Sequence, residues 1–173
     1  MCESCAQPNE QRVILALGAN LGHPLEQLEQ ACDLLAEEYG DLRLSQLYET
    51  SPVNCPADSP NYLNACIEIR TTQSPETLLK HCQAIETKLG RQRSGIYGEA
   101  RSCDIDIINY GSVQMSNKAL TLPHPRAHER AFVLQPLCDI DPQLKLAGQR
   151  KTAQELLQSL PPSPEHTIRP FDL

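Results

Sequence analysis

The sequence predicts an α+β fold of the ferredoxin-like type, a mostly antiparallel sheet with helices packed on one face. The expected order of elements is strand, helix, strand, strand, helix, strand, which is the order of that fold. Apolar and polar residues alternate cleanly over residues 62–71, as in a strand that turns one face to the core. Two segments with helical spacing each open on a proline and close on a glycine.

The first third of the chain is expected to supply two strands and a helix. A run of aliphatic residues over 12–18 predicts a buried strand. Pro24 suits the first position of a helix whose apolar residues recur at helical spacing as far as Gly40, a natural stop. Residues 42–48 are expected to form the second strand. Three prolines make residues 50–61 a loop.

The middle of the chain is expected to repeat this pattern. Strand 62–71 turns its odd-numbered aliphatic residues toward the core. Ser74 then caps a helix that begins with proline and ends at Gly90. Residues 91–100 are polar and contain two glycines, which favours a loop. This loop leads into a fourth strand at 101–108, where β-branched residues gather.

The C-terminal third is expected to add a short strand near 120–122, helices near 130–138 and 152–160, and a terminal strand at 167–171. We expect one domain, residues 12–173, preceded by a flexible extension over residues 1–11.

Composition excludes several classes of protein. No apolar run is long enough to cross a membrane, and the polar N-terminus has no signal-peptide core, so we expect a cytoplasmic protein. We also expect a monomer. The net charge of −7 argues against nucleic acid as a partner. Most of the eight cysteines lie within apolar patterns and are expected to stay reduced. Cys2 and Cys5 form a lone C-x-x-C pair, a weak basis for a metal or redox module.

Two carboxylates in the fourth strand are the main chemical signal. Asp104 and Asp106 share one face of the strand, about 7 Å apart along it. Side-chain reach closes this gap to the roughly 3.5–4 Å of a two-metal phosphoryl-transfer site. Oxygen ligands of this kind suit Mg²⁺, which takes its other ligands from water and substrate phosphates. The alternative from the residues alone is a solvated strand face.

The surroundings favour the metal site. Strand 62–71 turns Tyr62 and Asn64 to the face opposite its core side, and the sheet order places this face beside the two carboxylates. We therefore expect a ligand cleft on the sheet face away from the helices. Five arginines fall between residues 91 and 130 of this acidic chain, and with a lysine they outnumber the four acidic residues there. A local cationic region beside a carboxylate pair suits a magnesium–nucleotide ligand.

Six motifs in series resemble those of the 6-hydroxymethyl-7,8-dihydropterin pyrophosphokinase family of folate biosynthesis, in the right order and at the family's spacing. They are residues 17–22 (LGANLG), 48–52 (YETSP), 61–65 (NYLNA), 85–91 (IETKLGR), 101–106 (RSCDID) and 122–132 (LPHPRAHERAF). The resemblance implies ATP-dependent transfer of a diphosphate to the pterin hydroxymethyl group, with release of AMP. It implies small-molecule substrates only, with neither nucleic acid nor membrane as a partner.

The resemblance also assigns roles to residues of this sequence. Asp104 and Asp106 match the residues that bind two Mg²⁺ ions, and with Arg91 and Arg101 they form the implied catalytic set. The implied ATP-binding residues are Gln83, Glu86, Arg91, Arg101, Ile107, Thr121, His124 and Arg130. The implied pterin-binding residues are Thr50, Ser51, Pro52, Val53, Tyr62, Asn64 and Phe132, with the two aromatic rings on either side of the pterin. Pattern alone leaves Phe132 open as a core residue and Glu86 as a partner of Arg93.

One departure from the family favours a second interpretation. The family usually has aromatic-Gly-Pro-Arg before the carboxylate strand, whereas residues 97–101 here read YGEAR. The proline is missing, an acid is added and the aromatic residue is one place farther from Arg101. The alternative function is therefore a pterin- or nucleotide-binding paralogue with impaired transfer.

Overall fold

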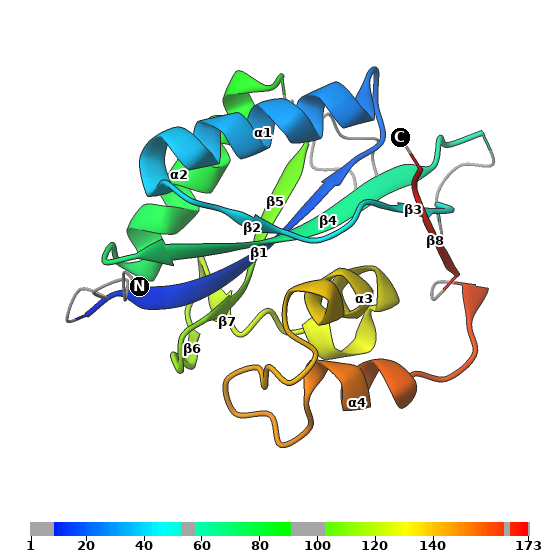
Figure 1. Cartoon of the computed structure of the whole chain (residues 1–173). Coiled ribbons are helices and arrows are strands. Elements are labelled where there is room, and N and C mark those ends of the chain that lie inside the picture. Colours follow the sequence, from blue (N-terminus) through cyan, green and yellow to red (C-terminus); the bar gives the residue numbers. More distant parts are fainter. Residues whose placement is uncertain (1–8, 53–57, 91–102, 165–166, 173) are drawn as a thin grey trace, which may run out of the picture.

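The structure, a computed structural model, describes residues 9–52, 58–90, 103–164 and 167–172 (Figure 1). Within these residues a six-stranded sheet has the order β5-β1-β4-β3-β8, with β2 also beside β4, and β6 and β7 form a separate hairpin. Every pairing among them is antiparallel. The strands are β1 (Gln11–Ala19), β2 (Arg43–Leu44), β3 (Tyr48–Thr50), β4 (Tyr62–Thr71), β5 (Asp104–Tyr110), β6 (Met115–Ser116), β7 (Thr121–Leu122) and β8 (Ile168–Pro170). The helices are α1 (Pro24–Tyr39), α2 (Pro75–Lys88), the 3₁₀ helix η1 (Ala127–Glu129), α3 (Ala131–Ile140) and α4 (Ala153–Gln158).

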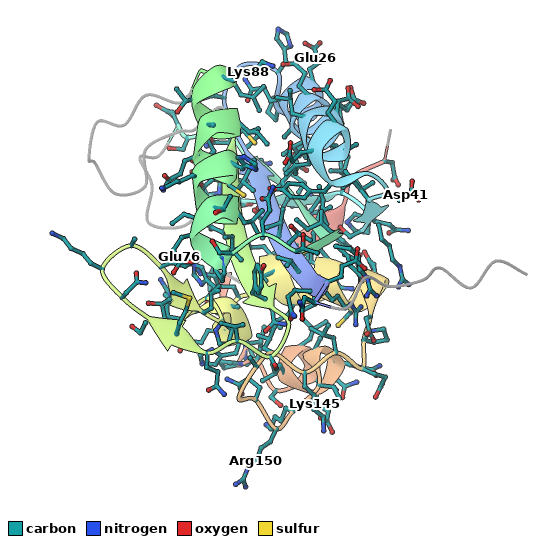
Figure 2. All side chains as sticks on the ribbon, turned by 90° about the vertical axis from the view of Figure 1, so that its left-hand side faces the viewer. Glu26, Asp41, Glu76, Lys88, Lys145 and Arg150 are labelled. Atoms are coloured by element: carbon teal, nitrogen blue, oxygen red, sulfur yellow. The ribbon has the colours of Figure 1, made fainter. Side chains whose placement is uncertain are left out.

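This architecture confirms the α+β, ferredoxin-like prediction. Helices α1 and α2 cover one face of the sheet (Figure 1) and share a core with β1, β4 and β5. Figure 2 shows Glu26, near the start of α1, and Lys88, at the end of α2, at the same end of the molecule, so these helices run antiparallel. Both begin with proline, and the Ser74 hydroxyl accepts a hydrogen bond from the Thr77 N–H at the start of α2, as expected.

A second helical layer, which the sequence did not place, covers part of the opposite sheet face. Helices α3 and α4 lie on that side (Figure 1), where a second core cluster includes Ile14 of β1, Cys66 of β4 and Ile108 of β5. This cluster covers the sheet face around Ile14 of β1. The polar residues of the same face lie towards the other end of β1, beside Gly18. None of the described helices is long and apolar enough to cross a membrane.

The predicted second strand, 42–48, was wrong in extent, because the chain there forms two short strands, β2 and β3, and the second reaches Thr50. Ser45 causes the break. Its hydroxyl accepts a hydrogen bond from the Cys66 N–H at 2.9 Å, while its own N–H donates to the Cys66 carbonyl at 3.0 Å. A side-chain oxygen thus replaces a backbone acceptor of the ladder, a known way for serine to interrupt regular pairing.

Strand β5 contains a bulge that the sequence pattern did not reveal. Ile14 pairs with Asn109 and Leu15 pairs with Ile107, so Ile108 is an extra residue on the β5 side. Ile108 packs in the second core cluster, whereas Tyr110, two positions later, packs in the first. The bulge therefore leaves Asp104 and Asp106 in regular alternation and reverses the pattern only beyond them.

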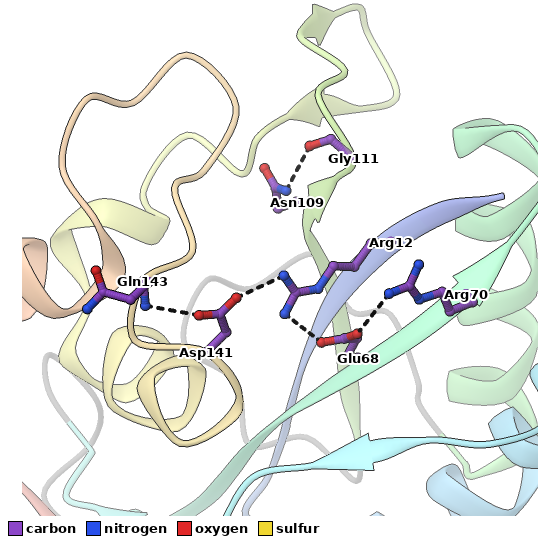
Figure 3. Close-up of polar contacts among 7 residues, drawn as sticks. All are labelled: Arg12, Glu68, Arg70, Asn109, Gly111, Asp141 and Gln143. Atoms are coloured by element: carbon purple, nitrogen blue, oxygen red, sulfur yellow. Dashed lines mark hydrogen bonds and ion pairs between the residues drawn. The ribbon is translucent and has the colours of Figure 1, made fainter. Parts of the chain in front are cut away.

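A charged network connects the second helical layer to the sheet (Figure 3). The Arg12 guanidinium of β1 donates to Glu68 of β4 at 2.7 Å and to Asp141, which follows α3, at 2.9 Å. The other oxygen of Asp141 accepts the Gln143 N–H at 3.0 Å. These partly buried bonds hold the C-terminal end of α3 against two central strands.

The network predicts a specific pH dependence of stability. Burial by itself raises the pKa of the Asp141 carboxyl, but the hydrogen bonds from Arg12 and Gln143 outweigh it and hold the pKa below its ordinary value. This stabilisation is present above the unfolded-state pKa and is lost as the pH falls through the folded-state pKa. We expect Asp141→Asn to lower the free energy of unfolding by about 1–2 kcal/mol at pH 7, and the difference from wild type to shrink towards pH 3.

Urea unfolding between pH 3 and pH 7 measures this difference, and Asp41→Asn, at an exposed position after α1, is the control. A destabilisation by Asp141→Asn that stays constant across this range, or that the control shows equally, would contradict the assigned role of the network.

Candidate active site

Three neighbouring strands place Asp104, Gly18 and Asn64 in one row across the sheet. Gly18 of β1 pairs with Asp104 of β5 on one side and with Asn64 of β4 on the other. Paired residues turn their side chains to the same face, so the polar residues of the two strands share a face, as predicted. The backbones of Asp104 and Asn64 lie two strand spacings apart, about 10 Å. Gly18, which has no side chain, lies between them.

The next row of the sheet contains the second carboxylate. Asp106 pairs with Ala16 of β1, and Ala16 pairs with Cys66 of β4. Asp104 and Asp106 are both half-buried on this face. Within the described part of the chain, no group of three or more His, Cys, Asp or Glu side chains could hold a metal ion. Two carboxylates alone fit Mg²⁺ when substrate phosphates and water supply its other ligands.

The gap at Gly18 is shaped by Asn64. The Asn64 side-chain amide donates to the Thr50 hydroxyl at 2.9 Å, and both residues are buried. This bond turns the Asn64 Oδ1 atom towards β1, where a Cβ added at Gly18 would lie only 3.3 Å away from it. The row therefore forms a floor with a hydrogen-bond acceptor at one end and a carboxylate at the other.

Glu86 of α2 supports the carboxylate strand from the opposite layer. Its side chain is 3% exposed, and its Oε1 atom accepts the Ile105 N–H at 2.8 Å. Ile105 lies between the two aspartates on β5, the strand at one edge of the sheet. A buried carboxylate thus fixes the backbone of this edge strand at the position that presents both carboxylates.

The segment between β7 and α3 brings cationic side chains to the Asp104 end of the floor. The His124 N–H donates to the Ile108 carbonyl at 2.8 Å, and its Nδ1 atom accepts the Arg126 N–H at 3.2 Å. Burial lowers the pKa of His124, the charges of Arg130 and Arg126 lower it further, and Asp104 opposes them. Because the His124 Nδ1 atom accepts the Arg126 N–H, the neutral ring carries its hydrogen on Nε2, which is a donor.

Phe132 lies beside this cationic group at the start of α3. Its half-buried ring packs against the edge of the second core cluster, and the Arg130 guanidinium carbon lies 5.4 Å from the ring centroid. A guanidinium at this distance over an aromatic face makes a favourable cation–π contact. This contact orders the Arg130 side chain on the same segment as His124.

Comparison with known proteins decides the family. The family model described as 7,8-dihydro-6-hydroxymethylpterin-pyrophosphokinase (HPPK) matches residues 14–142, which is more than half of the chain. The chain belongs to this family. HPPK proteins are transferases of folate biosynthesis that use ATP as co-substrate. The carboxylate row and the cationic segment described above lie within the matched residues.

Curated relatives of this family are close in sequence. The 2-amino-4-hydroxy-6-hydroxymethyldihydropteridine pyrophosphokinase of Pseudomonas aeruginosa is 40% identical over 154 residues, which cover 87% of this chain and 93% of that protein. The Methylorubrum extorquens protein of the same name is 40% identical over 155 residues, 88% of this chain and 95% of that one. The folic acid synthesis protein fol1 of Schizosaccharomyces pombe is 36% identical over 160 residues, but the chain spans only 22% of its length.

Solved structures support the fold alone. Wild-type Plasmodium falciparum HPPK-DHPS, solved with SDX-DHP, superposes with a TM-score of 0.65 at 15% identity. The match covers 86% of this chain and 44% of that one. The chain therefore spans less than half of this larger protein and corresponds to its HPPK-like part in architecture.

The structure places most of the HPPK residues predicted from the sequence, but not all on one surface. The side chain of Ile107 is buried in the first core cluster, on the face opposite the carboxylates. Thr121 is half-buried on β7, and Gln83 borders an open depression on α2. Ser51 and Pro52 follow β3, next to Thr50. Several predicted features lie outside the described residues: Val53, Arg91, Arg93, segment 97–101 with Arg101, and the pair Cys2 and Cys5.

Two contributions to this HPPK site were missed in the sequence. Gly18 was predicted only as the last residue of the first strand, yet β1 continues through it to Ala19. A glycine inside a strand often marks a close approach, and this signal identifies it as the floor of the site. The bond from the Ile105 N–H to Glu86 joins residues 19 apart in sequence, and no local pattern indicates it.

The floor predicts the effect of one added methyl group. Gly18→Ala places a Cβ 3.3 Å from Asn64 Oδ1, whose side chain Thr50 holds in position. We expect pterin affinity to fall by about 1–2 kcal/mol, because the methyl group occupies the gap and displaces Asn64. Stability should change little, because the strain of this contact offsets the roughly 0.5–1 kcal/mol by which alanine is favoured over glycine inside a strand.

Calorimetric titration with the reduced pterin measures the affinity, and urea unfolding measures the stability. Asn64→Ala serves as the matched second variant, because it removes the acceptor without filling the gap. An unchanged pterin affinity in a folded Gly18→Ala protein would show that the substrate does not lie over Gly18.

Proposed function

We propose that this chain transfers a diphosphate from ATP to the hydroxymethyl oxygen of 6-hydroxymethyl-7,8-dihydropterin, with the pterin over Gly18 and the triphosphate at Asp104. The observation that carries the proposal is the row Asp104, Gly18 and Asn64 across three paired strands. The row is about 10 Å long and has a hydrogen-bond acceptor at one end and a carboxylate at the other, which suits a planar heterocycle joined to a metal-bound polyphosphate.

The Asn64 end of the row is proposed to bind the pterin. Its Oδ1 atom is an acceptor, and the N–H groups on the edge of a pterin are donors. Tyr62 lies two residues before Asn64 on the same strand face, and Phe132 lies at the start of α3. We propose that these two rings stack on either side of the pterin, with the backbone of Thr50, Ser51, Pro52 and Val53 along its edge.

The Asp104 end is proposed to bind the phosphates. Asp104 and Asp106 would hold two Mg²⁺ ions, which would supply positive charge to offset that of the phosphates. His124, neutral and with Nε2–H free of the Arg126 bond, is suited to donate to a phosphate oxygen, and Arg130 adds a fixed positive charge. Arg91 and Arg101 remain predictions for the same role, as do Gln83, Glu86, Ile107 and Thr121 for ATP contacts.

The proposed reaction is an in-line displacement at the β-phosphorus of ATP. The pterin hydroxyl oxygen forms a bond to this phosphorus, the bond to the oxygen shared with the α-phosphorus breaks, and AMP leaves with that oxygen. The hydroxyl proton is released to solvent. A loose transition state needs little early deprotonation, so positioning by Gly18 and Asn64 and charge from Arg130 supply the catalysis. No protein nucleophile is required.

Several finer predictions from the sequence belong to this proposal. They are the monomeric state, the cytoplasmic location, the requirement for two Mg²⁺ ions and the single domain over residues 12–173 with a flexible extension at 1–11. The acidic net charge supports the expectation that nucleic acid is not a partner.

The reaction predicts both its product and its sensitive residues. Incubation with Mg–ATP and the reduced pterin should release AMP, which separates diphosphate transfer from an ordinary kinase that releases ADP. Asp104→Asn and Asp106→Asn should each lower kcat by about a thousandfold or more, because each removes a proposed metal ligand. Chromatography of the nucleotide products measures both, and Asp41→Asn is the exposed control.

Two outcomes would count against the proposal. Near-normal activity of the Asp106→Asn protein at limiting Mg²⁺ would contradict the two-carboxylate site. Tight binding of both substrates by the wild-type protein without AMP release would favour the alternative, a binding paralogue with impaired transfer.

A further inference from the structure

A second concave site lies on the α1 side of the sheet. It has a volume of about 610 Å³, within the usual range for small-molecule sites. Its walls come from helix α1 and strands β1 and β4, together with residues 44–47 and 170–172. Figure 1 shows the C-terminal end of the chain near the end of α1 that follows β1.

This cavity is separate from the proposed substrate floor. Leu17 and Ala65 line it, and they pair with each other in the sheet. Their immediate neighbours Gly18 and Asn64 form the floor described above. Because successive strand residues face opposite sides, the cavity and the substrate floor lie back to back across the same two strands.

The walls of the cavity are aliphatic. Leu25, Leu28 and Cys32 follow one another at helical spacing on α1, and Leu47 and Phe171 face them from the other side. Leu44 also lines the cavity and remains 51% exposed. These walls suit the apolar body of a ligand.

The polar lining is acidic. Glu29 and Asp33 lie one turn apart on α1, and Asp172 lines the opposite wall. Among the described residues, the lining contains no Lys, Arg or His, and none of these three carboxylates has an ion pair. Burial, followed by the charges of Asp33 and Glu29, raises the pKa of the Cys32 thiol to about 11. The negative field of the two α1 carboxylates therefore extends to the cavity wall.

We propose that this cavity binds a small organic cation, with its apolar body against Leu25, Leu28 and Leu44 and its ammonium or guanidinium group facing Glu29 and Asp33. An anionic ligand would be repelled by the three carboxylates. A neutral apolar ligand would gain nothing from these exposed carboxylates. A cation with an apolar body matches both the walls and the charges.

Three probes of equal chain length test the ligand class: hexyltrimethylammonium, hexanol and hexyl sulfate. The cation should bind more tightly than the alcohol, and the sulfate should not bind. Methyl NMR spectra of the protein should shift at the cavity leucines. The double change Glu29→Gln with Asp33→Asn should weaken binding of the cation by about tenfold and leave hexanol binding unchanged.

The matched control is Asp41→Asn with Glu76→Gln, which changes the net charge equally at two exposed positions outside the cavity lining. It should leave binding of the cation intact. Cys32→Phe, which places a ring in the cavity, should weaken binding of both the cation and hexanol. Equal weakening by the control pair, or unchanged binding of both probes in a folded Cys32→Phe protein, would overturn the proposal. If Cys32→Phe does not fold, the comparison of the two charge pairs still decides.

A competition experiment separates this site from the substrate floor. The cation should remain bound when the protein is saturated with the reduced pterin and a non-hydrolysable ATP analogue. Its displacement by either would place it at the substrate floor and would also overturn the proposal. The test does not depend on catalysis, so failure of the proposed reaction leaves it intact.

Discussion

Strand β1 lies between β4 and β5, and its register with both decides which side chains meet on each face of the sheet. A shift of one residue in either pairing would turn Asp104 or Asn64 to the side of α1 and α2. The aliphatic residues of β1 oppose such a shift. Val13, Leu15 and Leu17 are at most 2% exposed in the first core cluster, so a slipped register would expose them and bury the polar residues.

The two ends of β1 have different tasks on the second sheet face. At Ile14, an apolar surface packs against α3 and α4, and Arg12 connects β1 and β4 to the residue after α3. At Gly18, the same face is polar, with Asp104 and Asn64 on the neighbouring strands. Since α3 begins beside Arg130 and Phe132, the contacts near Arg12 also fix the helix that presents these side chains to the Gly18 end. The Arg12 end of β1 thus contributes to stability, and its Gly18 end contributes to the proposed substrate site.

Much of this arrangement follows from local patterns. Alternation over 62–71 identified the two faces of β4, and the spacing of Asp104 and Asp106 placed both carboxylates on one face. Helix starts at Pro24 and Pro75 followed from backbone preferences that act over a few residues. The family motifs then supplied the substrates, which no periodicity could indicate.

The features that sequence reasoning missed depend on contacts between distant segments. The break at Ser45 requires the Cys66 N–H of a neighbouring strand, and the bulge at Ile108 is defined only by its pairing with β1. Glu86 carries out its structural role through the Ile105 backbone. The second helical layer was missed because an apolar helix such as α3 shows that it is buried, but not which sheet face buries it.

The central claim is that the floor at Gly18 holds the pterin while Asp104 and Asp106 hold the metal-bound triphosphate. A crystal structure with Mg²⁺, a non-hydrolysable ATP analogue and the reduced pterin tests it most directly. The account predicts the pterin ring over Gly18 with a hydrogen bond to Asn64 Oδ1, and Mg²⁺ at about 2.1 Å from oxygens of both aspartates. A pterin bound away from Gly18, or aspartates without a metal ligand role in that complex, would contradict it.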